Sequence, residues 1–133
     1  MRLLLDTHIV LWYTSGNPQL PDGARRWIDE ADLACYSVIS LLEVAIKHGI
    51  SKERMPTSDE ELAAYADEAG LEFLSLEKQH IALLKALRLA PGAKKHLDPF
   101  DRMLICQAKA EGMRLLTHDA LLAGYGEPCV FLV

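Results

Sequence analysis

The chain has 133 residues, of which 50% are hydrophobic and 25% charged, and its formal net charge is −5 at pH 7. This length suits one α/β or α+β domain with a single hydrophobic core over residues 1–133. The acidic balance argues against a protein that coats nucleic acid, because such proteins usually present a basic face. It does not exclude an enzyme that gathers acids in one pocket around metal ions.

Hydropathy and cysteine spacing restrict the class of protein further. No apolar run approaches the roughly 20 residues that cross a bilayer, and Asp6 interrupts the apolar start too early for a signal peptide. We therefore expect a cytoplasmic protein without a membrane segment. Cys35, Cys106 and Cys129 are far apart and form no C-x-x-C pair, so we expect free thiols rather than disulfides or a zinc ribbon.

The first half of the chain alternates short apolar stretches with helical patterns. Residues 3–5 predict a buried strand, after which Asp6 and Thr7 cap a helix that begins near His8. The elements expected next are a helix over 21–30, a strand over 33–36, a helix capped by Ser37 or Ser40 and ended by Gly49, and a helix over 57–69 ended by Gly70.

The second half repeats this alternation, without internal repeats or linkers. The elements expected are a strand over 72–76, a helix over 77–87, a loop at 90–92, a helix over 98–110 ended by Gly112, a strand over 114–117, a short helix over 120–123 and a strand over 129–133. Strands separated by helices predict a three-layer α/β/α sandwich around a mostly parallel sheet of about five short strands. In such sheets, functional groups gather at the carboxyl ends of the strands.

Several acids fall where such a site is expected. Asp6 and Asp119 follow predicted strands, Glu43 lies within an apolar helix, and Asp101 lies in the first turn of its helix. Carboxylates gathered at one sheet edge raise one another's pKa unless a cation neutralises them. Their oxygen atoms select Mg²⁺ or Mn²⁺ rather than zinc. Because such a cation activates water and polarises a phosphoryl oxygen, the pattern favours hydrolysis of a phosphodiester.

Each acid also has a purely structural explanation. Asp6 and Asp119 are suited to cap the helices that follow them, and Asp98 is suited even better because proline follows it. Asp101 would complement the dipole of its helix, and Glu43 would belong to a polar stripe along its own helix. The acids as a set, rather than any one of them, therefore support the prediction of a metal site.

Four short stretches contain the acids or border on them: 4–7 (LLDT), 40–44 (SLLEV), 98–108 (DPFDRMLICQA) and 115–119 (LLTHD). In that order they resemble the four motifs of PIN-domain ribonucleases, and 98–108 closely resembles the third motif of VapC-type toxins. Together they cover nearly the whole chain. The resemblance implies a PIN-like fold and an Mg²⁺-dependent endoribonuclease, with Mn²⁺ as the other candidate cofactor.

The resemblance also implies roles for particular residues. Asp6, Glu43, Asp101 and Asp119 would bind the metal and act in catalysis, and Asp98 is a further candidate ligand in the longer form of the third motif. Accessory polar roles fall to Thr7 and Thr117. As the toxin of a VapBC-like toxin–antitoxin pair, the protein would bind a VapB-like antitoxin, form a homodimer and cleave RNA with a metal-activated water.

Basic residues near the acids are candidates for binding the RNA backbone: Lys94, Lys95, Arg102 and Arg114. Solvated surface charge explains each of them equally well. The alternative function is a non-catalytic RNA- or protein-binding module on the same fold, which would be expected to lack some of the acids. The chain has no G-x-S-x-G elbow of a serine hydrolase, and its five histidines lack zinc-ligand spacing such as H-E-x-x-H.

Overall fold

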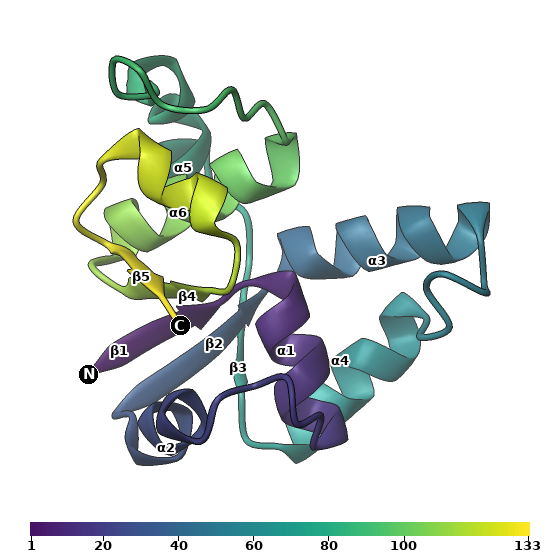
Figure 1. Ribbon diagram of the computed structural model, residues 1–133. Helices are drawn as coiled ribbons and strands as arrows, with labels where there is room; N and C mark the ends of the chain where they lie inside the picture. The colour runs from purple at the N-terminus through teal and green to yellow at the C-terminus, as the bar shows by residue number, and fades with distance from the viewer.

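The computed structural model describes residues 1–133, in which strands and helices alternate as the sequence predicts (Figure 1). The elements, with η denoting a 3₁₀ helix, are β1 (Arg2–Leu5), α1 (Thr7–Ser15), α2 (Asp22–Glu30), β2 (Leu33–Ser37), α3 (Val38–Ile50), α4 (Asp59–Glu68), β3 (Glu72–Leu74), α5 (Lys78–Ala82), η1 (Leu84–Ala86), α6 (Pro99–Glu111), β4 (Arg114–Thr117), η2 (Ala120–Tyr125) and β5 (Val130–Leu132).

The strands form one 5-stranded sheet in the order β3-β2-β1-β4-β5. Every neighbouring pair is parallel, so the sheet is fully parallel rather than mostly parallel. The chain builds outward from β1 through β2 to β3, and then returns to place β4 on the other side of β1. The strand order therefore reverses between β1 and β4, and crevices at such a switch point are where parallel sheets bind ligands.

Helices cover both faces of the sheet, which confirms the predicted three-layer sandwich (Figure 1). Because successive side chains of a strand point to opposite faces, Leu3 and Leu5 enter one core and Leu4 enters the other. The first core contains buried residues of α1, α2 and α4, and the second contains the buried face of α6 and residues of η2. Burial on both faces explains why the central strand β1 contains the continuous apolar run Leu3–Leu5.

Polar side chains begin several of the helices, as the sequence predicts. Asp6 caps α1, Asp98 caps α6 and Asp119 caps η2, each by accepting backbone N–H groups of the following turn. Ser37, rather than Ser40, caps α3. Three of these caps are acids that also belong to, or neighbour, the predicted metal site, so the capping and metal-binding interpretations apply to the same positions.

The helix predicted over 77–87 is wrong as one continuous element. The structure has the short helix α5 followed by the 3₁₀ turn η1. In a 3₁₀ helix, side chains three residues apart lie on the same side. This places Leu84 and Leu87 together against the second core, where both pack. Helix α3 also continues past Gly49 and ends at Ile50.

All the cysteines are free, as expected, and Cys35 and Cys106 are buried. Burial raises the pKa of both thiols, which keeps them protonated and unreactive. No helix in the protein combines the length and the hydrophobicity that crossing a membrane requires.

The central position of β1 makes its core residues costly to truncate. Leu4 is 0% exposed and Leu132, in the edge strand β5, is 51% exposed. We expect Leu4→Ala to lower the free energy of unfolding by about 2–5 kcal/mol, through lost burial and a residual cavity. Leu132→Ala, the matched control, should cost less than about 1 kcal/mol. Urea denaturation of both variants measures the difference, and equal losses would contradict the assigned core.

Candidate active site

Asp6 is held at the carboxyl end of β1 by donors from two segments. Its Oδ1 accepts the backbone N–H of Thr7 at 2.6 Å, and its Oδ2 accepts the hydroxyl of Thr117 at 2.6 Å. The Thr117 hydroxyl also accepts the backbone N–H of Asp119 at 3.1 Å, so one side chain links both acids. Burial raises the pKa of Asp6 despite these hydrogen bonds, and the nearby charge of Glu43 raises it further.

Glu43 is buried in α3 and is joined to the residue after Asp6. The Thr7 hydroxyl donates to Glu43 Oε1 at 2.8 Å, and Ser40 Oγ lies 2.9 Å from the same hydroxyl. One turn further along α3, the Lys47 ammonium forms an ion pair with Glu43 Oε2. Burial opposes the charge of Lys47, but the hydrogen bond and charge of Glu43 outweigh it and raise the pKa of this lysine. The predicted polar stripe therefore exists, and it neutralises Glu43.

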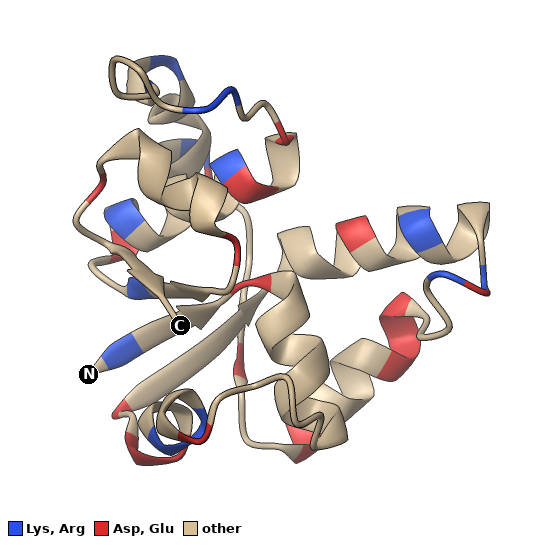
Figure 2. Cartoon of the chain, viewed as in Figure 1, with Lys and Arg blue, Asp and Glu red and all other residues tan.

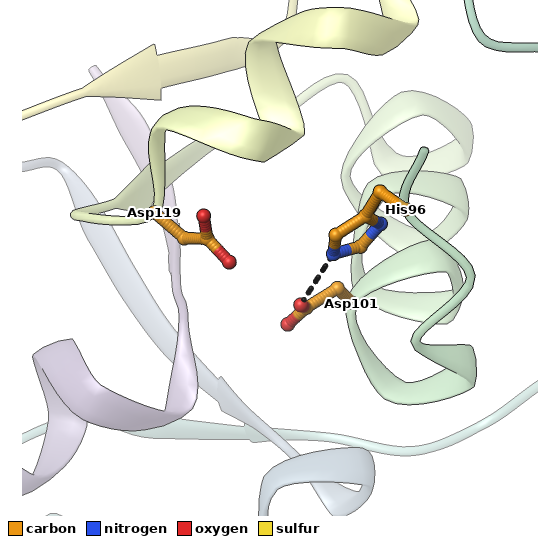
Figure 3. Close-up of side chains that lie close together, drawn as sticks. All are labelled: His96, Asp101 and Asp119. Carbon is orange, nitrogen blue, oxygen red and sulfur yellow. Dashed lines mark hydrogen bonds and ion pairs between the residues drawn. The ribbon is translucent and has the colours of Figure 1, made fainter. Parts of the chain in front are cut away.

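Asp101 and Asp119 face each other across a small space, together with a histidine (Figure 3). One carboxylate oxygen from each acid and one ring nitrogen of His96 all lie within 4.8 Å of one another. His96 Nε2 is 3.0 Å from Asp101 Oδ2. Asp101 comes from the first turn of α6, Asp119 from the turn after β4, and His96 from the loop before α6.

Asp101 is the acid of the site whose pKa is raised to a value near neutrality. Burial raises its pKa to about 8, with further increases from the charges of Asp6, Asp98, Glu43 and Asp119. All the sequence-predicted acids are therefore close enough to act on one carboxyl group. A group in this position ionises readily at neutral pH only when a cation binds beside it.

Asp98 has a different position from the other acids. Its Oδ1 accepts the backbone N–H groups of Phe100 at 2.8 Å and Asp101 at 3.1 Å, which confirms the predicted helix cap. Like Asp6 and Glu43, it lies outside the group of potential ligand atoms formed by His96, Asp101 and Asp119. The contacts that the structure shows for the Asp98 side chain are those of a helix cap.

A hollow of about 290 Å³ opens beside the acids, and Asp6 and Asp119 form part of its wall. The other lining residues are His8, Trp12, Gln19 and His118. The rings of Trp12 and His118 meet edge to face, with centroids 5.3 Å apart. The acidic site is therefore reachable from solvent along a partly aromatic groove.

The predicted basic residues do not all lie near the acids. Lys94 and Lys95 are exposed in the loop that leads into α6, and Arg102 follows Asp101 in that helix (Figure 2). The Arg102 guanidinium lies 5.7 Å from the centre of the Tyr125 ring. Arg114 begins β4, so it lies at the opposite edge of the sheet, over the Phe131 ring at 4.6 Å. The structure does not bring Arg114 to the acids.

Sequence reasoning missed His96. It stands five residues before Asp101, in an irregular loop directly after Lys94 and Lys95. No helical or strand periodicity relates it to the acids. Only the tertiary path of the loop places its ring in the site.

The potential ligands fit a divalent cation. The compact ligand group consists of one carboxylate oxygen each from Asp101 and Asp119 and one imidazole nitrogen of His96. Asp6 and Glu43 lie outside this group but close enough for their charges to raise the pKa of Asp101. Carboxylate oxygens suit Mg²⁺ or Mn²⁺. The fold and site thus define an α/β/α domain with an acidic pocket at the switch point of a parallel sheet. The chain belongs to the PIN domain family, whose sequence profile matches residues 3–127.

Solved structures share this fold over nearly the full chain. VapBC2 from Rickettsia felis, bound to a promoter DNA fragment, matches with a TM-score of 0.67 and 18% identity, over 100% of this chain and 98% of that chain. DNA-bound VapBC from Salmonella typhimurium matches with a TM-score of 0.65 and 21% identity, over 100% and 97%. A toxin–antitoxin complex from Klebsiella pneumoniae matches with a TM-score of 0.63 and 18% identity, over 98% and 99%.

At these identities, the structural likeness establishes the fold. A sequence comparison with curated proteins gives no match.

The raised pKa of Asp101 makes the stability of the metal-free protein depend on pH. The stabilisation associated with this group is fully present below its unfolded pKa of about 4 and is lost as the pH rises through about 8. In EDTA, Asp101→Asn should therefore melt several degrees above the wild type at pH 8, and the difference should shrink towards pH 5. Thermal melting across this pH range measures it.

Glu53→Gln provides the control for loss of an acid, because Glu53 is exposed in the turn after α3. It should leave the melting curve unchanged in EDTA at both pH values.

With Mg²⁺ present, the wild type should melt above Asp101→Asn, because a cation that binds only the folded state stabilises the wild type more. An Asp101→Asn variant that melts below the wild type at pH 8 in EDTA would contradict the raised pKa of Asp101.

Proposed function

We propose that the protein is a metal-dependent endoribonuclease and the toxin of a VapBC-like toxin–antitoxin pair. The observation that supports this most directly is that Asp101 and Asp119 lie close together, with Asp6 and Glu43 near enough for their charges to raise the pKa of Asp101, at the switch point of a PIN-domain fold. Phosphodiester hydrolysis is the chemistry that such a carboxylate cluster serves. A non-catalytic binding module on the same fold would have no need for buried acids that raise one another's pKa.

In the proposed mechanism, Asp6, Asp101 and Asp119 would hold Mg²⁺ or Mn²⁺, and Glu43 would bind the metal or orient the attacking water. When bound, the cation lowers the pKa of a water molecule and polarises the phosphoryl oxygen. Thr117 fixes the carboxylate of Asp6, and Thr7 fixes that of Glu43. These accessory threonines keep both acids oriented before any substrate arrives, which reduces the reorganisation needed during the reaction.

RNA binding would use the basic residues on the α6 side of the pocket. Lys94 and Lys95 lie in the loop that supplies His96, and Arg102 follows Asp101 in α6, which supports a role for them in contacting phosphates beside the acids. Arg114 has no place in this proposal because it lies at the opposite sheet edge.

A protein partner is supported by an apolar stripe on α3. Leu42, Ile46 and Ile50 are 50%, 44% and 80% exposed and follow one another at four-residue spacing, so they share one face of the helix. Exposed stripes of this kind commonly mark protein interfaces. We propose a VapB-like antitoxin as the partner, together with homodimerisation and a cytoplasmic site of action. The structural neighbours described as toxin–antitoxin complexes support this choice.

Catalysis should require both the cation and the acids. Purified protein, free of antitoxin, should cleave RNA with Mg²⁺ or Mn²⁺ and stop on addition of EDTA. Asp6→Asn and Asp101→Asn should each reduce the cleavage rate by at least about a hundredfold, because the isosteric amide removes the charge that the cation requires. Electrophoresis of labelled RNA measures the rate, and circular dichroism checks that the variants are folded.

Asp32→Asn is the matched control. Asp32 precedes β2 at the opposite edge of the sheet and pairs only with the N-terminal ammonium at the surface. Its removal should leave cleavage within about twofold of the wild type, because exposed ion pairs contribute little. Full cleavage in EDTA, or by Asp101→Asn, would overturn the proposed mechanism.

Substitution of Asp98 and of Asp101, the two aspartates of the third motif, should have different effects on activity. Asp98→Ser should retain most of the activity, because serine also caps a helix well. Asp101→Ser should lose activity and also lose the stabilisation by Mg²⁺, because a hydroxyl does not supply the charge that Mg²⁺ requires. Kinetics and melting with and without Mg²⁺ measure both effects. An inactive Asp98→Ser beside an active Asp101→Ser would transfer the metal-binding role to Asp98.

A further inference from the structure

His96 is a buried histidine that the proposed mechanism leaves without a role. It is 7% exposed, and its ring faces Asp101 and Asp119 across the space between them (Figure 3). Its two ring nitrogens have different partners. Nδ1 lies 2.9 Å from the Tyr125 hydroxyl, and Nε2 lies 3.0 Å from Asp101 Oδ2.

Tyr125 determines which nitrogen of His96 carries the proton. The Tyr125 hydroxyl donates its single hydrogen to the backbone carbonyl of His96 at 2.8 Å. Since a carbonyl oxygen only accepts, the Tyr125 oxygen must accept the other hydrogen bond from Nδ1–H. In the neutral imidazole, Nε2 is then the nitrogen with the free lone pair, and it points into the acidic site. A histidine whose second nitrogen is committed in this way is typical of metal ligands.

His96 Nε2 and Asp101 Oδ2 both carry lone pairs, so their contact at 3.0 Å is a hydrogen bond only when one of the two atoms is protonated. Metal binding displaces such protons, because imidazole and carboxylate bind cations in their deprotonated forms. The ligand atoms of His96, Asp101 and Asp119 already lie within 4.8 Å of one another. Ligands on opposite sides of one small divalent cation are about 4 Å apart, so a small inward movement of these side chains completes the coordination.

We propose that His96 Nε2 ligates the metal together with Asp101 and Asp119, and that this makes the site prefer a transition-metal ion such as Mn²⁺ to Mg²⁺. This inference rests on the proposed metal site but not on the identity of the substrate. Imidazole nitrogen binds first-row transition ions well, whereas Mg²⁺ selects oxygen ligands. Tyr125 acts as a positioning residue, because it touches the imidazole rather than the cation.

Electron paramagnetic resonance of bound Mn²⁺ tests the inference directly. Pulsed measurements on the intact protein should show coupling of the Mn²⁺ electron spin to a histidine nitrogen, and ¹⁵N-histidine labelling should change the coupling pattern. His96→Gln should abolish the coupling while Mn²⁺ still binds through the carboxylates. His8→Gln and His118→Gln are the matched controls, because both side chains line the neighbouring hollow but do not belong to the ligand group. Both should retain the coupling.

Calorimetric titration with Mn²⁺ and with Mg²⁺ provides the second measurement. His96→Gln should weaken Mn²⁺ binding by at least about tenfold and change Mg²⁺ binding by less than about threefold. Tyr125→Phe should weaken Mn²⁺ binding by about tenfold, because the imidazole is no longer held in one orientation. A purely structural His96 would leave the ratio of the two affinities unchanged.

The outcomes separate this inference from the proposed function. Bound Mn²⁺ without nitrogen coupling would overturn the histidine ligand, whatever the result with RNA. Coupling that disappears in His96→Gln supports the ligand even if no RNA is cleaved. If His96→Gln does not fold, the variants of the other four histidines decide: His48→Gln and His80→Gln are added, since these rings bond the Met55 carbonyl and Glu111. Coupling retained in all four assigns it to His96, and coupling lost in any of them overturns the inference.

Discussion

The contact between β1 and β4 determines where the acids meet. These strands are neighbours at the centre of the sheet, and the hydrogen bond from Thr117 to Asp6 joins residues 111 positions apart. Because both strands end at the same edge, the residues that follow them, Asp6 and Asp119, are brought together. Helix α6, packed on one face of the sheet, supplies Asp101 from its first turn. The packing of the whole sheet therefore holds a group of like charges together.

Helix capping and cation binding are compatible functions of the same aspartates. A carboxylate has two oxygens with several acceptor positions. Asp119 uses Oδ1 to accept the N–H of Leu121 at 2.9 Å, which leaves its other oxygen for the site. The N-termini of α1 and α6 also direct the positive ends of their dipoles towards the acids, which offsets part of the repulsion. The structural interpretation of these positions thus explains how the charges are tolerated rather than competing with the functional one.

Local signals in the sequence were sufficient for most of the fold. Apolar strands, capping residues and glycine stops predicted the order of the elements and the layers, since each depends on a few neighbouring residues. The break between α5 and η1 was missed because it depends on how Leu84 and Leu87 pack against α6 and its neighbours. The acids could be predicted because they follow regular elements whose ends meet at one edge.

The positions of residues outside regular elements were harder to predict, because they depend on tertiary contacts rather than on neighbouring residues. His96 lies in the irregular loop before α6, and nothing local shows that its ring turns towards Asp101. Arg114 was predicted, with Lys94, Lys95 and Arg102, to bind the RNA backbone. A strand rises about 3.3 Å per residue, however, so Arg114 and the acids stand at opposite ends of β4.

Compensation of charge differs among the acids, and this difference suggests a division of roles. Glu43 is already neutralised, since Lys47 pairs with one oxygen and Thr7 donates to the other. Asp6 accepts hydrogen bonds on both oxygens but has no cationic partner of this kind. The Asp101 carboxylate has one hydrogen-bond partner, His96, and burial and the neighbouring acids raise its pKa to about 8. The need for a cation is therefore greatest at Asp101 and least at Glu43, and in the proposed mechanism Asp101 would be the principal ligand and Glu43 the residue that orients water.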